Sequence, residues 1–585
     1  MNNTEWNLKS IYESFDDIRF ACDLSEAKER SESIYSYLKS RSGNSPKDII
    51  EHYIDEMNSI GTITSRLMEY CLLRLSKDSK DSLAALNYDR INNITADSAK
   101  TKAAFAEFIS ACKDLDKIIG SSEKISEHRL FIEEAKSSCK HMLSEAEETL
   151  YAKMRNTGSL SWEKLWENIT SGLTCAIDLD GDKKFLPLSE TRNMAYSSAP
   201  QERKAAFESE IRSLETIAPQ AAAALNSIKG EVINICGIRK YTSPLEMTLI
   251  DSRMDKDIFN SLMSAVKKCV PYFGDYFTAK ARMLGHRGAL PFYDLFAPVT
   301  NSDISFTYSE AQEFIVGNFG SFSTELGDFA AKAFENGWID VYPAKGKVGG
   351  AFCSYIHAVG ESRILTNFTG SFSDVVTIAH ELGHAYHGEI LKNESFLNCD
   401  YPMPLAETAS TFCELLVKNA ALKSSPKNES VMILENDLCD SAQIVVDIMS
   451  RFIFEDTVFK KRAEGTISPD DLCRIMLDAQ KETYGQGLSE YHPYMWTVKP
   501  HYYDAQCNYY NFPYAFGLLL SRGLYSLYRK NGQSFVDQYK HFLRMTGRLP
   551  INEAAHCIGI DLTGNSFWDI SVESIREDID CFCSL

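Results

Sequence analysis

Residues 371–393 of the sequence read SFSDVVTIAHELGHAYHGEILKN. Apolar side chains recur there at intervals of three and four residues, which predicts a helix rather than a strand. On such a helix His380 and His384 lie one turn apart on the same face, where both can bind one metal ion. Glu381 lies about 100° further round the helix and can reach a water on that metal. The stretch therefore indicates a zinc hydrolase.

The His-Glu-x-x-His pattern has only three fixed letters, and a chain with 12 histidines can contain it by chance. A further ligand makes the functional interpretation stronger. Residues 402–420, PMPLAETASTFCELLVKNA, predict a second helix that begins at two prolines and carries Glu407. Two histidines and a glutamate leave one position open on a tetrahedral Zn²⁺, as catalysis requires. We predict one zinc ion per chain, bound by His380, His384 and Glu407.

Two other carboxylates could orient a ligand histidine from behind. Glu414 lies two turns after Glu407 on the same face of its predicted helix. Asp374 lies in the first turn of the first helix, where Ser371 and Asp374 also have the spacing of a capping box. Glu414 and Asp374 are equally compatible with ordinary solvated helix carboxylates, so both interpretations stay open.

The composition is that of a soluble globular protein, with 585 residues, 44% hydrophobic and 24% charged. A net charge of -20 argues against a nucleic-acid surface. No apolar run is long enough to cross a bilayer, and the first residues, MNNTEWNLKSIYESF, lack the pattern of a signal peptide. The 16 cysteines are mostly scattered singly, as expected of reduced thiols. We expect a cytoplasmic protein without nucleic-acid or membrane partners.

The first 150 residues predict a succession of helices, including one that opens at Ser45-Pro46 and further helical stretches over 82–118 and 125–154. Turn signals after these helices favour a boundary near residue 190. This divides the chain into an N-terminal helical domain, residues 1–190, and a domain of residues 191–585 that carries the zinc site. We expect a mostly α fold.

Strand character is expected only just before the zinc helix, at residues 338–343 and 363–370. A short sheet there could bind an extended peptide as an added strand along its open edge. The glycines between these strands, Gly346, Gly349 and Gly350, are compatible with an ordinary turn or with a loop that faces the substrate. Residues 290–299, LPFYDLFAPV, predict an extended connection.

A second unusual stretch, residues 496–528, reads WTVKPHYYDAQCNYYNFPYAFGLLLSRGLYSLY. It places His501 close in sequence to several tyrosines. Aromatic clusters usually fill protein cores. A zinc peptidase, however, also needs hydrogen-bond donors for the oxyanion of its tetrahedral intermediate, and histidine or tyrosine can supply them.

At these residues the chain resembles the oligoendopeptidase F family, relatives of thimet oligopeptidase and neurolysin. The resemblance covers most of the chain after about residue 120. The segments that carry it are KGKVGGAF at 345–352, NFTGSFSDVVTIAHELGHAYH at 367–387, PLAETASTFCE at 404–414, and PHYY and YYNFPYAFG within 500–517.

The resemblance implies a mostly helical ellipsoid with a deep central channel that admits short peptides and excludes folded proteins. It also implies a role for each site residue. The metal ligands would be His380, His384 and Glu407, the general base Glu381, and the residues that bind substrate and oxyanion His501, Tyr510 and Tyr514.

The function that we predict is that of a zinc metalloendopeptidase, which hydrolyses internal bonds of short oligopeptides. One alternative is an exopeptidase on the same zinc site, although the aminopeptidase segment G-x-M-E-N is missing before the zinc helix. Another is a peptide-binding protein without catalytic activity. The presence of Glu381 argues against this alternative, because a binding protein has no need of a general base.

Overall fold

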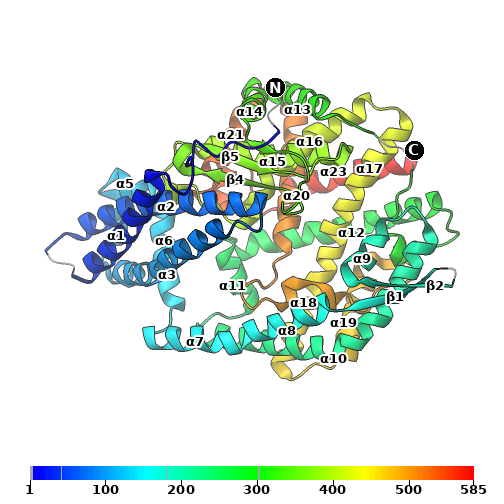
Figure 1. The fold of residues 1–585 in the computed structure, drawn as a ribbon, viewed down its shortest axis with the longest axis horizontal. Coiled ribbons are helices and arrows are strands. Elements are labelled where there is room, and N and C mark those ends of the chain that lie inside the picture. Colours follow the sequence, from blue (N-terminus) through cyan, green and yellow to red (C-terminus); the bar gives the residue numbers. More distant parts are fainter. Residues whose placement is uncertain (1–3, 41–42, 180, 301–303) are drawn as a thin grey trace. The chain divides into compact units, whose positions relative to one another are not determined.

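The computed structural model describes residues 4–40, 43–179, 181–300 and 304–585. Across these residues the chain is mostly α-helical, with one two-stranded and one three-stranded sheet (Figure 1). This confirms the expected mostly α fold with a small sheet beside the helix at 371–393. None of the described helices is both long and apolar enough to span a membrane.

The chain forms two compact units, and each consists of separate segments. The first unit contains residues 1–142, 303–423 and 524–561, and the second contains residues 143–302, 424–523 and 562–585. A compact unit is not necessarily a domain that folds independently. The predicted division of the chain into the domains 1–190 and 191–585 therefore stays a prediction.

The first unit begins with the mutually packed helices α1 (Ile18–Ser40), α2 (Pro46–Lys77) and α3 (Ser82–Ala111). Helix α2 begins as predicted, because Ser45 is its N-cap, forms a capping box with Asp48 and is followed by a proline at the first helical position. The other α-helices of this unit are α4 (Leu115–Gly120), α5 (Glu123–Glu127), α6 (Arg129–Ser138), α13 (Tyr308–Phe322), α14 (Thr324–Glu335), α15 (Phe372–Leu391), α16 (Met403–Ser424), α21 (Val536–Met545) and α22 (Ile551–His556).

Two long helical stretches expected from the sequence are in fact interrupted. The stretch 82–118 breaks after α3, where Asp114 has the left-handed φ of 54° before α4 begins. The stretch 125–154 contains the end of α5, all of α6, and most of α7 (Glu145–Thr157). Helix α7 starts at the Ser144–Glu147 capping box. A capping box satisfies the free N–H groups of a first helical turn, so a continuous helix could not pass through Ser144.

The three-stranded sheet lies against α15 and has the strand order β3-β5-β4 (Figure 1). Strand β3 (Ile339–Asp340) is parallel to β5 (Glu361–Leu365), whereas β4 (Phe352–Ile356) is antiparallel to it. The strands are shorter than the predicted 338–343 and 363–370, although the Phe368 N–H still donates to Val341 O at 2.9 Å. The sheet thus leads directly into the helix that carries the histidines.

The glycine-containing loop before β4 is hydrogen-bonded on both sides. The Ser79 N–H donates to Gly346 O at 3.0 Å, and the Val348 N–H donates to Ser76 O at 2.9 Å. The Asn367 amide donates to Gly350 O at 2.8 Å. Gly346 and Gly350 have φ values of 91° and 79°, a conformation that favours glycine. The loop is therefore a defined turn fixed to the end of α2.

The expectation that strands occur only before the zinc helix is wrong. Strands β1 (Thr174–Leu179) and β2 (Asp182–Pro187) pair as an antiparallel hairpin. Only Cys175 and Ile177 of β1 are buried, and β2 has no buried residue, so the alternation that would mark these strands is short. The hairpin is stabilised by packing against α10, which the local sequence does not show.

The second unit is built around the long helices α10 (Pro200–Ile238) and α12 (Lys256–Met283). The prediction of an extended connection at 290–299 is only partly right, because Phe292–Asp294 form a 3-10 helix and a turn follows at 295–296. The Asp294 N–H donates to Pro291 O at 3.0 Å within this turn. Helix α20 (Phe512–Asn531) begins in this unit and ends in the first. The other α-helices of the second unit are α7, α8 (Ser159–Ser171), α9 (Leu188–Asn193), α11 (Pro244–Asp251), α17 (Lys427–Ala442), α18 (Ile448–Glu464), α19 (Pro469–Tyr484) and α23 (Asn565–Ser584).

Candidate metal centre and aromatic cluster

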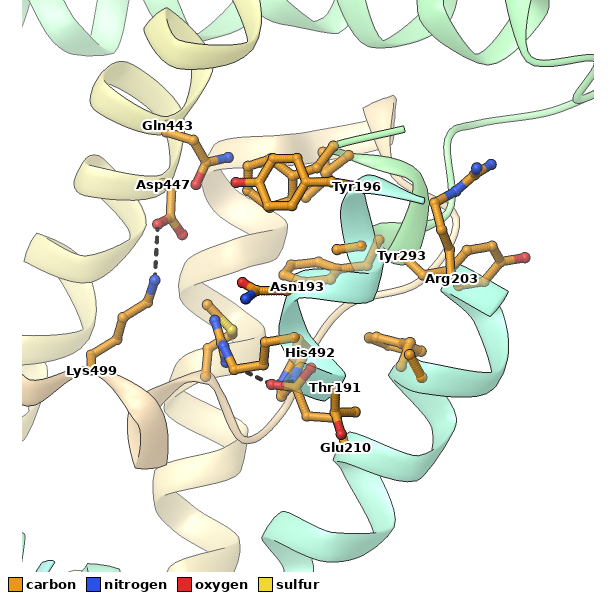
Figure 2. A pocket seen from close by; sticks show the side chains of 18 of the residues that line it. Thr191, Asn193, Tyr196, Arg203, Glu210, Tyr293, Gln443, Asp447, His492 and Lys499 are labelled. Atoms are coloured by element: carbon orange, nitrogen blue, oxygen red, sulfur yellow. Dashed lines mark hydrogen bonds and ion pairs between the residues drawn. The ribbon is translucent and has the colours of Figure 1, made fainter. Parts of the chain in front are cut away.

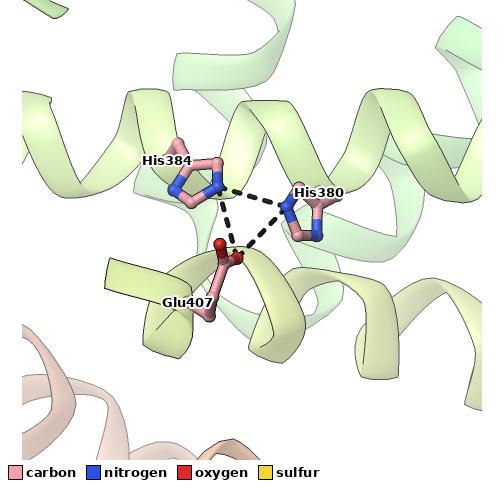
Figure 3. A group of neighbouring side chains, drawn as sticks. All are labelled: His380, His384 and Glu407. Carbon is pink, nitrogen blue, oxygen red and sulfur yellow. Dashed lines mark hydrogen bonds and ion pairs between the residues drawn. The ribbon is translucent and has the colours of Figure 1, made fainter. Parts of the chain in front are cut away.

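Helix α15 presents both predicted histidines from one face. It begins at the predicted capping box, in which the Asp374 N–H donates to Ser371 Oγ at 3.1 Å. Several of its apolar residues, among them Val375 and Ile378, are completely buried, and the helix packs on β4 and β5. This burial fixes the rotation of α15, and His380 and His384 point towards Glu407 of α16 (Figure 3).

A glycine allows α16 to approach the histidine helix closely. A Cβ atom at Gly383 would lie 2.5 Å from Ala409 O and 2.6 Å from Ser410 Cα, both backbone atoms of α16. No side chain fits into such a separation, so only glycine permits the two helices to pack in this way. The close packing brings Glu407 next to the histidine pair.

The three predicted ligands converge on one point (Figure 3). His384 Nε2 lies 3.1 Å from His380 Nε2. Glu407 Oε2 lies 3.3 Å from His380 Nε2 and 3.4 Å from His384 Nε2. Ligand atoms about 2.0–2.1 Å from a tetrahedral zinc ion lie about 3.3–3.4 Å from each other. The donor atoms and their separations therefore fit a zinc ion.

Glu414 holds His380 from behind. The His380 Nδ1–H donates to Glu414 Oε1 at 2.5 Å, which leaves Nε2 directed at Glu407 and His384. The Lys418 ammonium donates to Glu414 Oε2 at 2.9 Å. Of the two carboxylates suggested for this role, Glu414 is thus in contact with a histidine and is itself held by a lysine one turn away.

The electrostatic environment favours a cation. Burial alone would lower the pKa of His380, but hydrogen bonds with Glu407 and Glu414 outweigh it and raise the pKa to about 10. Burial opposes ionisation of both glutamates as well. The histidines nevertheless lower the pKa of Glu407, while Lys418 and His380 lower that of Glu414 to about 2. A metal ion would replace the proton of His380 in the same negative field.

Glu381 lies next to the ligands but points to a different side of the helix. The residue is 6% exposed, and no described residue forms a hydrogen bond with its carboxylate. Burial raises its pKa, an effect that His380 and His384 oppose. A carboxylate with a raised proton affinity and a free oxygen can accept a proton from a nearby water.

Asp374 has a different role from Glu414. Its Oδ2 accepts hydrogen bonds from the N–H groups of Thr369, Gly370 and Ser371, at 2.8–3.0 Å. Burial would raise the Asp374 pKa, but hydrogen bonds from Thr369 and Ser371 outweigh burial and lower it. Asp374 therefore caps α15 and, in this structure, does not orient a ligand histidine.

Two contacts around the ligands were missed in the sequence, although helical spacing could have revealed them. Ser410, three residues after Glu407, donates from its hydroxyl to Glu407 Oε2 at 2.7 Å. Lys418, four residues after Glu414, forms the ion pair described above. Both are ordinary neighbours on one helix face.

The second unit assembles the predicted aromatic residues into a cluster. The His501 ring stacks on the Tyr510 ring at a centroid distance of 4.6 Å and an interplanar angle of 15°. Tyr510 meets Tyr514 edge to face at 5.8 Å. His501 comes from the short turn Pro500–Tyr503, and Tyr514 from the first turn of α20.

A buried ion pair fixes the segment that carries Tyr510. The Lys229 ammonium donates to Glu455 Oε1 at 2.6 Å and to Asn508 Oδ1 at 2.9 Å. The same glutamate accepts the Tyr509 N–H at 3.1 Å. Tyr509 has a φ of 51°, which is unfavourable for a bulky residue and persists only where surrounding contacts hold it.

His501 is kept neutral by its surroundings. Burial lowers its pKa, and the positive charges of Arg451 and Lys499 lower it further. Its Nδ1 is buried and has no hydrogen-bond partner among the described residues. A neutral imidazole retains one N–H donor for a ligand.

The family of the chain follows from comparison with known proteins. A family model described as peptidase family M3 matches residues 193–573. The chain belongs to peptidase family M3. A second model, described as oligopeptidase F, matches residues 112–174 of this M3 peptidase. Membership makes the chain a peptidase and therefore a hydrolase, and it implies a metal ion at the active site.

Relatives of known sequence agree with this assignment. Oligopeptidase PepF of Bacillus subtilis is 25% identical over 526 residues, which cover 88% of this M3 peptidase and 78% of that protein. Group B oligopeptidase PepB of Streptococcus agalactiae is 24% identical over 550 residues, with 90% of each chain covered. The predicted resemblance to oligoendopeptidase F is thereby confirmed.

Solved structures show the same fold. A crystal structure from Chlamydophila abortus has a TM-score of 0.86 at 21% identity and covers 100% of this M3 peptidase and 98% of its own chain. Oligoendopeptidase-F from Enterococcus faecium has a TM-score of 0.70 at 17% identity and covers 96% and 97% of the two chains.

Gly383→Ala should weaken the contact between α15 and α16. The new methyl group would meet backbone atoms of α16, so we expect a loss of about 1–3 kcal/mol, seen as a lower unfolding midpoint, together with weaker zinc binding. Gly274→Ala in α12 is a matched control, because its Cβ would meet no atom within 4 Å. It should leave the midpoint unchanged or raise it slightly. Equal midpoints and zinc affinities for the two variants would contradict this role of Gly383.

Glu414→Gln should lower zinc affinity about 10- to 100-fold, because His380 would lose the carboxylate that orients it. A competition titration with a coloured chelator measures the change. Asp374→Asn serves as the comparison, because Asp374 caps α15 without contacting His380. It should reduce thermal stability more than metal affinity. Unchanged zinc affinity in Glu414→Gln would show that this hydrogen bond does not support the metal centre.

Proposed function

We propose that the chain is a zinc-dependent endopeptidase that hydrolyses internal bonds of short oligopeptides. The main support is the convergence of His380, His384 and Glu407 at separations of 3.1–3.4 Å, with Glu381 adjacent on the same helix. Three ligands leave one position on a tetrahedral metal for water or substrate, which distinguishes a catalytic from a structural site. A cytoplasmic location is part of this proposal.

The carboxylate of Glu381 is the general base in this mechanism. When bound, Zn²⁺ would acidify water and polarise the scissile carbonyl group. Glu381 removes the proton from the attacking water and transfers it to the leaving amine. Its raised pKa suits both transfers, because a general base works best when its pKa approaches the working pH.

His501, Tyr510 and Tyr514 are proposed to bind substrate and to stabilise the oxyanion. The neutral ring of His501 and the two phenol groups are hydrogen-bond donors held in one cluster. Donors fixed before the reaction cost no reorganisation when the negative charge develops.

The sheet beside α15 is proposed to align the peptide. Strand β4 is paired with β5 on one side, and among the described strands none is paired with its other edge. An extended peptide can bind there through main-chain hydrogen bonds. This mode places few demands on side chains and suits an enzyme that cleaves varied short peptides.

Glu381→Gln should bind zinc but lose nearly all turnover, because the amide cannot accept the proton of the water. The assay is the cleavage of a quenched fluorescent peptide blocked at both ends, with product masses determined and zinc content measured. Full activity of the zinc-loaded variant would refute the assignment of the base.

The same assay separates the proposed endopeptidase from its alternatives. Internal cleavage that a chelator abolishes and zinc restores supports the proposal. Cleavage only of peptides with a free terminus would indicate an exopeptidase. Zinc binding without cleavage of any peptide in a varied set would indicate a peptide-binding protein.

His501→Ala should lower kcat by about 10²- to 10³-fold with the zinc content unchanged, the usual cost of losing an oxyanion donor. Tyr510→Phe and Tyr514→Phe remove one hydroxyl group each, so comparison of their kcat values identifies the participating phenol. Tyr491→Phe is the matched control, because its hydroxyl donates to Gly485 O outside the cluster. A kcat for His501→Ala equal to that of the control would exclude His501 from catalysis.

A further inference from the structure

The second unit contains a cavity with a volume of about 200 Å³ that the proposed reaction does not use. Its walls come from α9 and the residues after it, from α10, from the end of α19, and from the segments 292–296, 443–447 and 492–499 (Figure 2). All of these residues belong to the second unit, whereas the three predicted metal ligands belong to the first. The volume is smaller than the roughly 300–1,000 Å³ of pockets for drug-sized ligands, and it suits a molecule of about the size of one amino acid.

One part of the cavity wall is aromatic. Phe207 packs against Phe292 and Tyr293, each at a ring centroid distance of 5.8 Å. Tyr196 and Phe296 form a second aromatic pair at 5.0 Å. Such surfaces bind an apolar or aromatic group by burial and by edge or face contacts between rings.

Lys499 places a positive charge at the cavity (Figure 2). Its side chain is 14% exposed, and its ammonium lies 3.7 Å from Asp447. None of the described residues forms a hydrogen bond with this ammonium, and Asp447 has a closer ion pair with Arg451. Burial lowers the Lys499 pKa to about 8, although Asp447 opposes the shift. The charge of Lys499 is thus poorly compensated within the protein.

The other charged residues of the wall have closer partners. Arg192 pairs with Glu210 at 2.6 Å, and Glu210 also lies 3.4 Å from His492. Arg203 pairs with Asp294 at 2.7 Å. Among the cations that line the cavity, Lys499 is therefore the one whose charge is least compensated by a counter-ion.

An unusual backbone segment adds a second polar group. Residues Gln443–Asp447 form a π-helical turn, η6, and both end residues line the cavity. Such turns are rare and often occur at functional sites. The Gln443 side-chain amide lines the same cavity and has no hydrogen-bond partner among the described residues, so it is a free donor for a bound ligand.

We propose that this cavity binds a small carboxylate with an aromatic or apolar body, of the size of a single N-acylated amino acid. The carboxylate would lie against the Lys499 ammonium and the Gln443 amide, and the body would lie against Phe207 and its aromatic neighbours. The site is separate in the chain from the metal ligands, and it goes beyond the proposed peptidase function.

The test uses the full chain and the probe N-acetyl-L-phenylalanine, with binding followed by ligand-detected NMR titration. We expect saturable binding of this probe. Its carboxamide, which lacks the negative charge, and N-acetylglycine, which lacks the aromatic ring, should both bind much more weakly. Binding should persist after chelation of the metal. Equal binding of the carboxamide, loss of binding on chelation, or no saturable binding would each overturn the proposal.

Lys499→Met keeps most of the apolar stem and removes the charge. It should weaken the probe about 10- to 100-fold, the usual effect of losing a charged hydrogen bond of about 1.5–3 kcal/mol. Lys204→Met is the matched control, because the Lys204 side chain is 58% exposed on α10 and does not line the cavity. Equal affinities in these two variants would overturn the proposal. If Lys499→Met does not fold, the comparison of probe and carboxamide on the unaltered protein decides.

Discussion

The candidate metal centre depends on one close packing contact, the approach of α16 to α15 at Gly383. Two histidines on a helix supply a pair of ligands wherever that helix lies. A third ligand from another helix must arrive within a few tenths of an ångström. The separation of about 2.5 Å between a hypothetical Gly383 Cβ and Ala409 O shows how little room this contact leaves. The adjacent sheet completes the restraint, because burial of the apolar face of α15 sets its rotation.

Charged and polar side chains around this contact are linked by successive hydrogen bonds. Lys418 holds Glu414, Glu414 orients His380, and Ser410 holds Glu407, so both glutamates are fixed by hydrogen bonds before a metal arrives. Pre-oriented ligands reduce the entropy that metal binding must overcome. The raised pKa of His380 reports the same field, since two carboxylates stabilise positive charge at its ring. Glu381 lies on the same helix, and burial raises the pKa of its carboxyl group.

The second unit uses buried charge in a comparable way. Lys229 and Glu455 are almost completely buried, and replacing one partner would leave an uncompensated charge. Their pairing anchors Asn508 and Tyr509, and thereby the ring of Tyr510 that stacks on His501. Lys499 differs, because its nearest counter-ion is shared with Arg451 and its ammonium lies at a cavity. Lys229 has close hydrogen-bond and ion-pair partners within the protein, as expected of a structural charge. Lys499 lacks such partners, as expected of a residue in a candidate binding site.

Features that depend on residues close together along the chain could be predicted from the sequence. The start of a helix at Ser45, the capping box at Ser371, the helical spacing of His380 and His384, and the position of Glu407 on its own helix were predicted correctly. These features follow from local hydrogen bonds and helical period. Three other features became clear only from the folded chain. Glu414 contacts His380 whereas Asp374 caps a helix, β1 and β2 pair and pack on α10, and Lys499 and Gln443 line one cavity. Each of these depends on the packing of distant segments, and local propensity carries no information about it.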